Sequence, residues 1–365
     1  MRDFCPIKRM DHLEFYVGNA RQAAVFYAAR YGFTNTAYHR LKTGCRETAS
    51  YLLEQGDIRF VLTSPLTPNH PITRHVQRHG DGVGVIALEV PDVRAAFQET
   101  TRRGAAAAME PTEAQDASGL FRQASIHLYG DTLLLFVERG DYRGTFAPGF
   151  QSTGKSSSQR DTAGLLAIDH IVGNVELGAM DKWVRVLADT MGFTELAHFD
   201  DKTIVTEYSA LMSKVMQDGT GRIKFPINEP ASGRRKSQIQ EYLDYYRGPG
   251  VQHIALSTDD IIETVVQLRS RGVDFLHVPP AYYADLEGRV GSISEPVDKL
   301  ADLGILVDRD DEGYLLQIFT QPVEDRPTLF FEVIERHGSR GFGEGNFKAL
   351  FEAIEREQAL RGNLV

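Results

Sequence analysis

The chain contains an internal repeat, and this repeat limits the folds that it can adopt. The segment that begins MDHLEFYVGN at Met10 is similar to IDHIVGNVEL at Ile168, and GVGVIALEVPD at Gly82 is similar to GVQHIALSTDD at Gly250. Each copy has a short apolar run typical of a strand, followed by a helical pattern and a glycine that can end the helix. We therefore predict an α+β fold of two similar domains, each built from two βαβββ modules that form an open, curved, barrel-like sheet.

A polar segment separates the two copies. Tyr142 to Gly164 is rich in serine and glycine and has no hydrophobic period, as is typical of a linker. The chain of 365 residues also exceeds the length of about 250–300 residues at which a single core usually stops growing. We expect an N-terminal domain over residues 1–150, a linker over 151–163 and a catalytic C-terminal domain over 164–365.

The composition excludes several classes of protein. There are 40 basic and 50 acidic side chains, a net charge of −10, so we expect no nucleic-acid partner. No run approaches the about 18 consecutive apolar residues of a membrane span, so we also expect no membrane partner. Cys5 and Cys45 are too few for a disulfide framework, and the start MRDFCPIKRM lacks the apolar core of a signal peptide. These features predict a cytoplasmic location.

Glu332 is an unusual residue for its position. It lies in TLFFEVIERHG, an apolar run typical of a buried strand, where a lone carboxylate would be costly to desolvate. It could point to an exposed face, be protonated or paired with a base, or bind a metal. When the two halves are aligned, His12 matches His170, and apolar Val85 and Phe136 match His253 and Glu332. At these three aligned positions the second half therefore has only polar residues, which are His170, His253 and Glu332.

Two histidines and one carboxylate can form a facial triad, which favours non-heme Fe(II). Zinc uses similar ligands, although the His-Glu-x-x-His signature of zinc hydrolases is absent. Either histidine by itself is more often a hydrogen-bonded core residue than a ligand. Their equivalent places in a repeated fold favour a metal site in the second half. The arrangement resembles the vicinal oxygen chelate superfamily, whose curved sheet closes around a pocket that can hold a metal.

Six motifs in order resemble those of the 4-hydroxyphenylpyruvate dioxygenase family. The similarity is dense from Ile168 to Leu360 and weaker over the first 140 residues. It implies an Fe(II) enzyme of tyrosine and phenylalanine catabolism, a homo-oligomer (dimer or tetramer), that converts 4-hydroxyphenylpyruvate and O₂ to homogentisate and CO₂. The motifs are IDHIVGNV, FPINEPA, RRKSQIQEYLDYYRGPGVQHIALSTDDI, GYLLQIFTQPV, LFFEVIERHG and GFGEGNFKALFEAIE.

The resemblance also implies roles for individual residues. His170, His253 and Glu332 would bind the iron, and Asn228 and Gln317 would contribute to catalysis. Gln252 adjoins His253, so its place in the pocket requires a twist or a bulge in the strand. The polar substrate-binding residues would be Ser213, Asn228, Gln238, Gln252 and Gln317, with an aromatic clamp of Phe319, Phe342 and Phe347.

The last helical segment, NFKALFEAIEREQAL, carries an apolar stripe. Asn346 can cap it, and its apolar residues recur at intervals of three and four. The helix could simply pack on the core. The resemblance instead implies a lid that covers the site. The stripe is Phe347, Leu350, Phe351 and Ile354, and the glycines of the expected hinge are Gly338, Gly341, Gly343 and Gly345.

Three other functions remain open from the sequence. A 4-hydroxymandelate synthase would use the same substrate and iron but form another product. An extradiol dioxygenase would share the fold and the triad but require a catechol. A non-catalytic binding module would turn over nothing.

Overall fold

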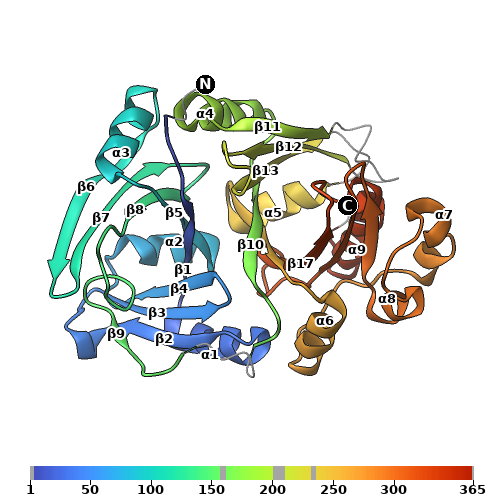
Figure 1. Ribbon diagram of the computed structural model, residues 1–365, viewed down its shortest axis with the longest axis horizontal. Helices are drawn as coiled ribbons and strands as arrows, with labels where there is room; N and C mark the ends of the chain where they lie inside the picture. Colours follow the sequence, from blue (N-terminus) through green and yellow to red (C-terminus); the bar gives the residue numbers. More distant parts are fainter. Residues whose placement is uncertain (1–3, 157–161, 200–209, 232–235, 364–365) are drawn as a thin grey trace.

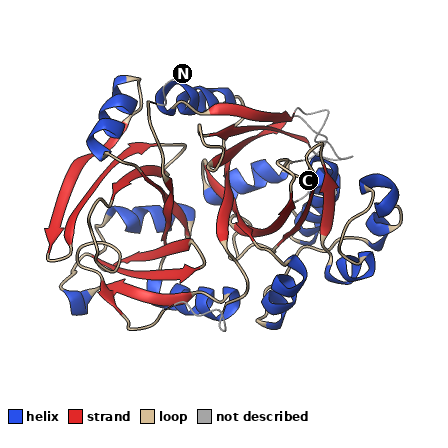
Figure 2. Cartoon of the chain, in the orientation of Figure 1, coloured by secondary structure: helices blue, strands red, loops and turns tan. Residues whose placement is uncertain are grey.

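The computed structural model describes residues 4–156, 162–199, 210–231 and 236–363. Two curled mixed sheets lie side by side, and helices pack around each of them (Figure 1). Strands form one curled sheet in each half, and helices lie around the sheets (Figure 2). The predicted fold class is confirmed. No helix of the described ranges is long and apolar enough to cross a membrane.

The first sheet has nine strands in the order β6-β7-β8-β5-β1-β4-β3-β2-β9. Its strands are β1 (Arg9–Tyr16), β2 (Thr34–His39), β3 (Thr48–Gln55), β4 (Ile58–Pro65), β5 (Gly82–Glu89), β6 (Ala107–Asp116), β7 (Gly119–His127), β8 (Leu133–Glu138) and β9 (Gln151–Ser152). Its helices are α1 (Ala20–Tyr31), η1 (Leu41–Thr43), α2 (Pro71–His79) and α3 (Val93–Arg102).

The second sheet has eight strands in the order β11-β12-β13-β10-β14-β17-β16-β15. Its strands are β10 (Ala167–Asn174), β11 (Thr194–Phe199), β12 (Ala210–Gln217), β13 (Lys224–Ala231), β14 (Gly250–Ser257), β15 (Leu306–Arg309), β16 (Tyr314–Phe319) and β17 (Phe330–His337). Its helices are α4 (Met180–Met191), α5 (Gln238–Tyr246), α6 (Ile261–Ser270), η2 (Pro280–Tyr283), α7 (Leu286–Val290), α8 (Val297–Leu303), η3 (Glu344–Asn346) and α9 (Phe347–Leu360).

The sheets repeat each other strand for strand. The order β2-β3-β4-β1-β5-β8-β7-β6 of the first sheet corresponds to β11-β12-β13-β10-β14-β17-β16-β15 of the second. The first sheet gains β9, which pairs with β2 through Tyr38 and Gln151. Part of the expected linker is therefore a strand of the first sheet. We propose that the chain divides into an N-terminal domain over 1–150, a linker over 151–163 and a C-terminal domain over 164–365, with β9 at the start of the linker added to the first sheet.

One apolar core joins the two halves, and it explains which way β17 faces. The Phe331 ring lies 5.0 Å from that of Tyr31 and 6.1 Å from that of Phe60, both in the first half. Successive side chains of a strand point to opposite faces. Because Phe331 faces the first half, Glu332 faces the interior of the second sheet.

Candidate active site

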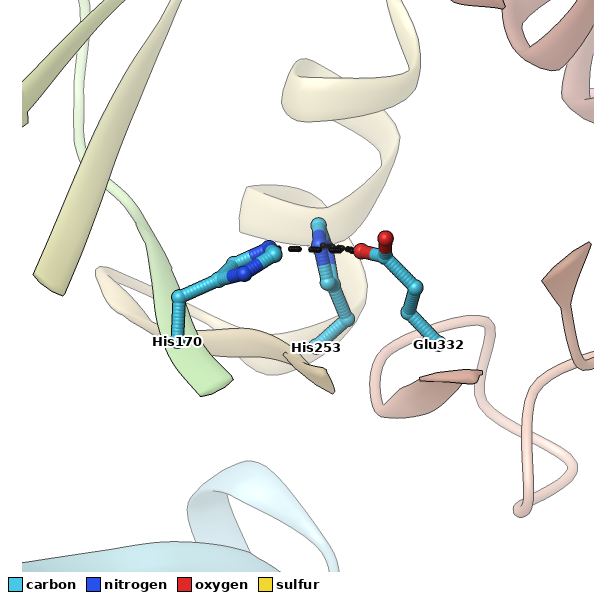
Figure 3. Close-up of side chains that lie close together, drawn as sticks. All are labelled: His170, His253 and Glu332. Atoms are coloured by element: carbon cyan, nitrogen blue, oxygen red, sulfur yellow. Dashed lines mark ion pairs between the residues drawn. The ribbon is translucent and has the colours of Figure 1, made fainter. Parts of the chain in front are cut away.

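Three potential metal ligands meet on neighbouring strands of the second sheet. His170 lies on β10, His253 on β14 and Glu332 on β17, and these strands are adjacent. The Oε2 atom of Glu332 lies 3.2 Å from Nε2 of His170 and 3.5 Å from Nε2 of His253 (Figure 3). All three side chains are buried. Their ligand atoms lie within 4.8 Å of one another, close enough to share one ion.

Two β-bulges between β10 and β14 aim these side chains. The pairing register shifts directly before His170, where Asp169 is the extra residue in β10. It shifts again directly before His253, where Gln252 is the extra residue in β14. A bulge re-aims a side chain, so consecutive residues can face the same side of a sheet. The bulge that a pocket position for Gln252 requires is therefore present.

Each imidazole is oriented by the residue that precedes it. Nδ1 of His170 donates to Oδ1 of Asp169 at 2.8 Å, and Nδ1 of His253 donates to Oε1 of Gln252 at 3.1 Å. These bonds place a proton on Nδ1 of each ring and turn Nε2, the atom that would bind a metal, toward Glu332. Metal-binding histidines usually have such a partner on their other ring nitrogen. The donor set therefore fits a divalent cation.

The pKa values of the three groups depend on how many carboxylates each imidazole contacts. Burial lowers the pKa of His170, but Glu332 and Asp169 outweigh it and raise this pKa above its ordinary value. His253 has one carboxylate and an uncharged amide as partners, so burial dominates and its pKa is lowered. Burial raises the pKa of Glu332, but the two imidazoles outweigh it and lower this pKa. Glu332 is therefore ionised, as a metal ligand must be.

The triad opens into a mainly apolar pocket. Seven of the predicted substrate-binding residues line it, on strands β12, β13, β14 and β16, at the start of α5, in the segment that leads into α9 and at the start of α9. Ser213 and Asn228 are register partners across β12 and β13, so they lie side by side. These seven residues are Ser213, Asn228, Gln238, Gln252, Phe319, Phe342 and Phe347.

Gln317 does not line this pocket. It lies on β16 two residues before Phe319, and its side chain packs against Gly343, where a Cβ atom would overlap its amide. Gln317 is 1% exposed, and neither its Oε1 nor its Nε2 atom has a hydrogen-bond partner in the described parts of the chain. An unpaired buried amide costs about 1–3 kcal/mol, so its presence needs a reason.

Helix α9 covers the pocket with the predicted apolar stripe. Phe347, Leu350, Phe351 and Ile354 all line the pocket. Asn346 is the N-cap residue of α9, as expected, but its side chain makes no capping bond and instead accepts a hydrogen bond of 2.5 Å from the Tyr282 hydroxyl. Leu350 and Ala353 of α9 also belong to the apolar core, so the helix both packs on the core and lines the pocket.

The described residues contain one other cluster of possible ligands, Glu295, Glu335 and His337. Nε2 of His337 lies 2.8 Å from Glu335 and 3.2 Å from Glu295, and its ring stacks on Tyr314. Oε2 of Glu335 accepts from the backbone N–H of Ile261 at 2.7 Å. These groups largely satisfy one another, and they lie outside the pocket.

Comparison with known proteins identifies the family. Residues 9–122 and 167–318 match the model of the Glyoxalase/Bleomycin resistance protein/Dioxygenase superfamily. The 4-hydroxyphenylpyruvate dioxygenase of Aspergillus fumigatus is 47% identical over 98% of this chain and 94% of its own length. That of Dictyostelium discoideum is 49% identical over 97% of this chain and 99% of its own. The chain belongs to the 4-hydroxyphenylpyruvate dioxygenase family.

A solved structure of an enzyme with another name is also similar. A triple mutant of 4-hydroxymandelate synthase from Streptomyces coelicolor matches with a TM-score of 0.86 and 32% identity, over 97% of this chain and 99% of that one. The architecture of the dioxygenase family is therefore shared with a synthase, and fold alone does not separate the two reactions.

Several pocket residues of this family member were missed in the sequence. Four of them lie two positions from a predicted site residue on the same strand, so the alternation of strand faces could have found them. Phe330 is one of these, and its ring stacks on His253 at 4.8 Å. Phe199 had no such signal. The missed lining residues are Val172, Phe199, Val215, Pro226 and Phe330.

The first half lacks an intact triad, but one predicted equivalence is wrong. In the parallel pairing of β14 with β17, Ala255 lies opposite Glu332. In the matching pair β5 and β8, Ala87 lies opposite Leu135. The equivalent of Glu332 is therefore Leu135 and not Phe136, because the chain before β17 is one residue longer.

Proposed function

We propose that this chain is an Fe(II)-dependent 4-hydroxyphenylpyruvate dioxygenase, which converts 4-hydroxyphenylpyruvate and O₂ to homogentisate and CO₂. The observation that carries the proposal is the convergence of His170, His253 and Glu332 at the base of an apolar pocket, in a member of this family. Two imidazoles and one carboxylate leave coordination positions open and favour non-heme iron over zinc.

The metal ligands hold the ion, and their neighbours keep them oriented. A bound ferrous ion would supply the redox chemistry that O₂ requires. Asp169 and Gln252 keep the Nδ1 protons of His170 and His253 in place, so both Nε2 atoms remain available as ligands. Glu332 contributes the negative charge that partly balances the cation.

The pocket suits a small aromatic acid. Phe319, Phe342 and Phe347 offer ring faces and edges for the aromatic part of the substrate. Ser213, Asn228, Gln238 and Gln252 supply the few polar groups that orient a ligand in an apolar site. Their roles as substrate ligands, with Asn228 also catalytic, are part of the proposal.

We include Gln317 among the catalytic and substrate-binding residues although it lies behind the pocket wall. Its amide is buried with no hydrogen-bond partner within the described ranges, and it touches the loop before α9. A small movement of Gly343 would let this amide reach a bound substrate. Helix α9 would then exclude water from the reacting groups, as lids do in other enzymes.

The test is anaerobic reconstitution with Fe(II), followed by 4-hydroxyphenylpyruvate and air. We expect oxygen uptake, CO₂ release and homogentisate in equal amounts. Glu332→Gln keeps the shape of the side chain but removes its charge, so we expect turnover to fall by at least about 1,000-fold with the fold intact by circular dichroism. Unchanged turnover in this variant would remove the metal assignment.

The alternative is 4-hydroxymandelate synthase, and the similarity to the Streptomyces coelicolor structure favours it over other rivals. The curated relatives with 43–49% identity are dioxygenases, which favours homogentisate as the product. Chromatography of the aromatic product decides between them. Hydroxymandelate as the main product would contradict our proposal. Assembly into dimers or tetramers and a cytoplasmic location are proposals that rest on the family resemblance.

A further inference from the structure

Arg336 connects a metal ligand to the loop that leads into α9. It lies four residues after Glu332 on β17 and is mostly buried, with its side chain 17% exposed. Nε donates to Oδ2 of Asp169 at 2.7 Å and Nη2 donates to Oδ1 at 2.8 Å, a bidentate pair. The same Oδ1 atom accepts the Nδ1 proton of His170. Arg336 therefore fixes the carboxylate that orients this imidazole.

The remaining nitrogen of Arg336 holds the loop between β17 and α9. Nη1 donates to the carbonyl of Gly341 at 2.7 Å and to that of Ser339 at 3.3 Å. The next residue, Phe342, places its ring edge-on to His170, with the ring centroids 5.1 Å apart. The loop is thus connected to His170 in two ways. Phe342 contacts the imidazole directly, and Arg336 links the loop to it through Asp169.

The first half contains the same set of contacts without a metal triad. Arg139 donates to both oxygens of Asp11, at 2.6 and 2.7 Å, and Asp11 accepts the Nδ1 proton of His12 at 2.6 Å. Arg139 also donates to the carbonyl of Phe146, whose ring lies edge-on to His12 at 5.1 Å. The unit therefore forms in both halves, and only the second half adds His253 and Glu332 to it.

We propose that Arg336 is a positioning residue that couples closure of the loop at residues 338–346 to the orientation of His170. The inference rests on the proposed function, since it requires that His170 bind the metal. Without Arg336, the buried Asp169 loses its counter-charge and the loop loses two hydrogen bonds. His170 and the loop would then loosen together. Because coupling between two sites is reciprocal, metal binding should also order the loop.

The experiment measures metal affinity and loop protection in the same set of full-length proteins. Co(II) serves as an air-stable probe, its affinity is measured by calorimetry, and hydrogen exchange reports on residues 338–346 with and without the metal. The variants are Arg336→Met, Arg336→Lys and the matched control Arg139→Met, which removes the same contacts in the half without a triad.

We expect Co(II) to slow exchange of the loop in the wild type. Arg336→Met should weaken Co(II) binding by about 10–100-fold and abolish this metal-dependent slowing. Arg336→Lys should restore part of both effects, and Arg139→Met should leave both at the wild-type level. If Arg336→Met does not fold, Asp169→Asn cuts the same chain of contacts and should give the same result.

Two outcomes would overturn the inference. In one, Arg336→Met binds Co(II) as the wild type does and keeps the metal-dependent slowing. In the other, Arg139→Met weakens binding as much as Arg336→Met, which would make the effect one of general stability. A wild type that binds no Co(II) and no Fe(II) would overturn the proposed function as well, whereas normal binding in all variants would overturn only this inference.

Discussion

At the residue scale, Gln317 is a side chain that the fold alone does not explain. It is buried on β16, and its two polar atoms have no partner in the part of the chain that the structure describes, while its neighbour Ile318 belongs to the apolar core. Folding would favour an apolar residue at such a position. A substrate that accepts or donates a hydrogen bond there would account for the amide.

Gln317→Leu should separate stability from activity. Leucine has a similar volume and removes two unpaired polar atoms, so we expect the free energy of unfolding to rise by about 1 kcal/mol. The value of kcat/KM should fall by about 10–100-fold, because the substrate loses a hydrogen bond.

Gln358→Leu is the matched control for this change. Gln358 on α9 also has a buried amide with no partner among the described residues, but the side-chain atoms nearest to Gly343 of the loop are those of Gln317 and not those of Gln358. It should gain similar stability with little change in kcat/KM. Equal loss of activity in both variants would contradict a substrate role for Gln317.

The candidate metal ligands could be predicted from sequence because the repeat shows which polar residues one half lacks. His170, His253 and Glu332 each replace or match a residue at an equivalent strand position. Asp169 and Arg336 could not be predicted in this way. They pair across 167 residues of sequence, and both halves keep the pair, so the comparison of halves gives no contrast.

At the element scale, backbone N–H groups of the loop before α9 donate hydrogen bonds to aspartate side chains of β15 and of the turn after it. The N–H of Gly345 donates to Asp308 at 2.9 Å and that of Gly341 donates to Asp310 at 2.8 Å. Gly343 has φ of 75°, a conformation that favours glycine. These bonds and the positive φ fix the conformation of the loop. A hinge motion of the loop, as proposed, would have to break the hydrogen bonds.

Gly343→Ala should disturb both the loop and the active site. Alanine is strained at this φ, by about 1 kcal/mol, and its Cβ would overlap the Gln317 amide. We expect a lower melting temperature and a fall in kcat/KM. The control is Gly178→Ala, since Gly178 has φ of 78° and open space around the Cβ position. It should lose stability only, and a similar fall in kcat/KM there would refute the steric explanation.

The apolar stripe of α9 could be predicted because its spacing is local. Phe347, Leu350, Phe351 and Ile354 follow the helical period and face the pocket. That the Asn346 side chain makes no capping bond could not be predicted, because this depends on groups that are distant in sequence. Tyr282 is 64 residues away along the chain, and its hydroxyl takes the Asn346 side chain out of the capping position.

At the scale of the whole molecule, the two halves meet across a surface that buries ionisable groups. Glu324 lies close to Gly80 and Asp81 of the first half and to Arg326 of the second. Burial and the negative charge of Asp81 raise the pKa of Glu324 to about 8. The folded protein therefore keeps this carboxyl protonated at pH values where the unfolded chain ionises it.

The raised pKa of Glu324 predicts that stability falls as pH rises. Between about pH 4.5 and 8 the folded state holds one proton more than the unfolded state, so the free energy of unfolding decreases with pH. Glu324→Gln should remove this dependence and stabilise the protein at pH 8 by about 1–3 kcal/mol, relative to its effect at pH 4.5. Denaturant unfolding at several pH values measures it. The control is Asp325→Asn, a change at the exposed neighbouring residue. An identical pH profile for the wild type and Glu324→Gln would contradict the raised pKa of Glu324.

The duplicated architecture could be predicted because each repeat carries its own strand, helix and terminal glycine. The exact register could not, and Phe136 was matched to Glu332 in error. Thr132 and Thr328 look equivalent in sequence, but Leu135 of β8 and Glu332 of β17 lie opposite the equivalent alanines Ala87 and Ala255 of their own sheets. Cross-strand pairing, which involves residues distant in sequence, decides such a one-residue shift.

The most direct test of the metal site is anomalous diffraction at the iron edge from crystals loaded with Fe(II) without oxygen. We predict a single strong peak about 2.0–2.2 Å from Nε2 of His170, Nε2 of His253 and a carboxylate oxygen of Glu332. A peak at the second cluster of Glu295, Glu335 and His337, with none between the two imidazoles and Glu332, would contradict the site and the chemistry proposed for it.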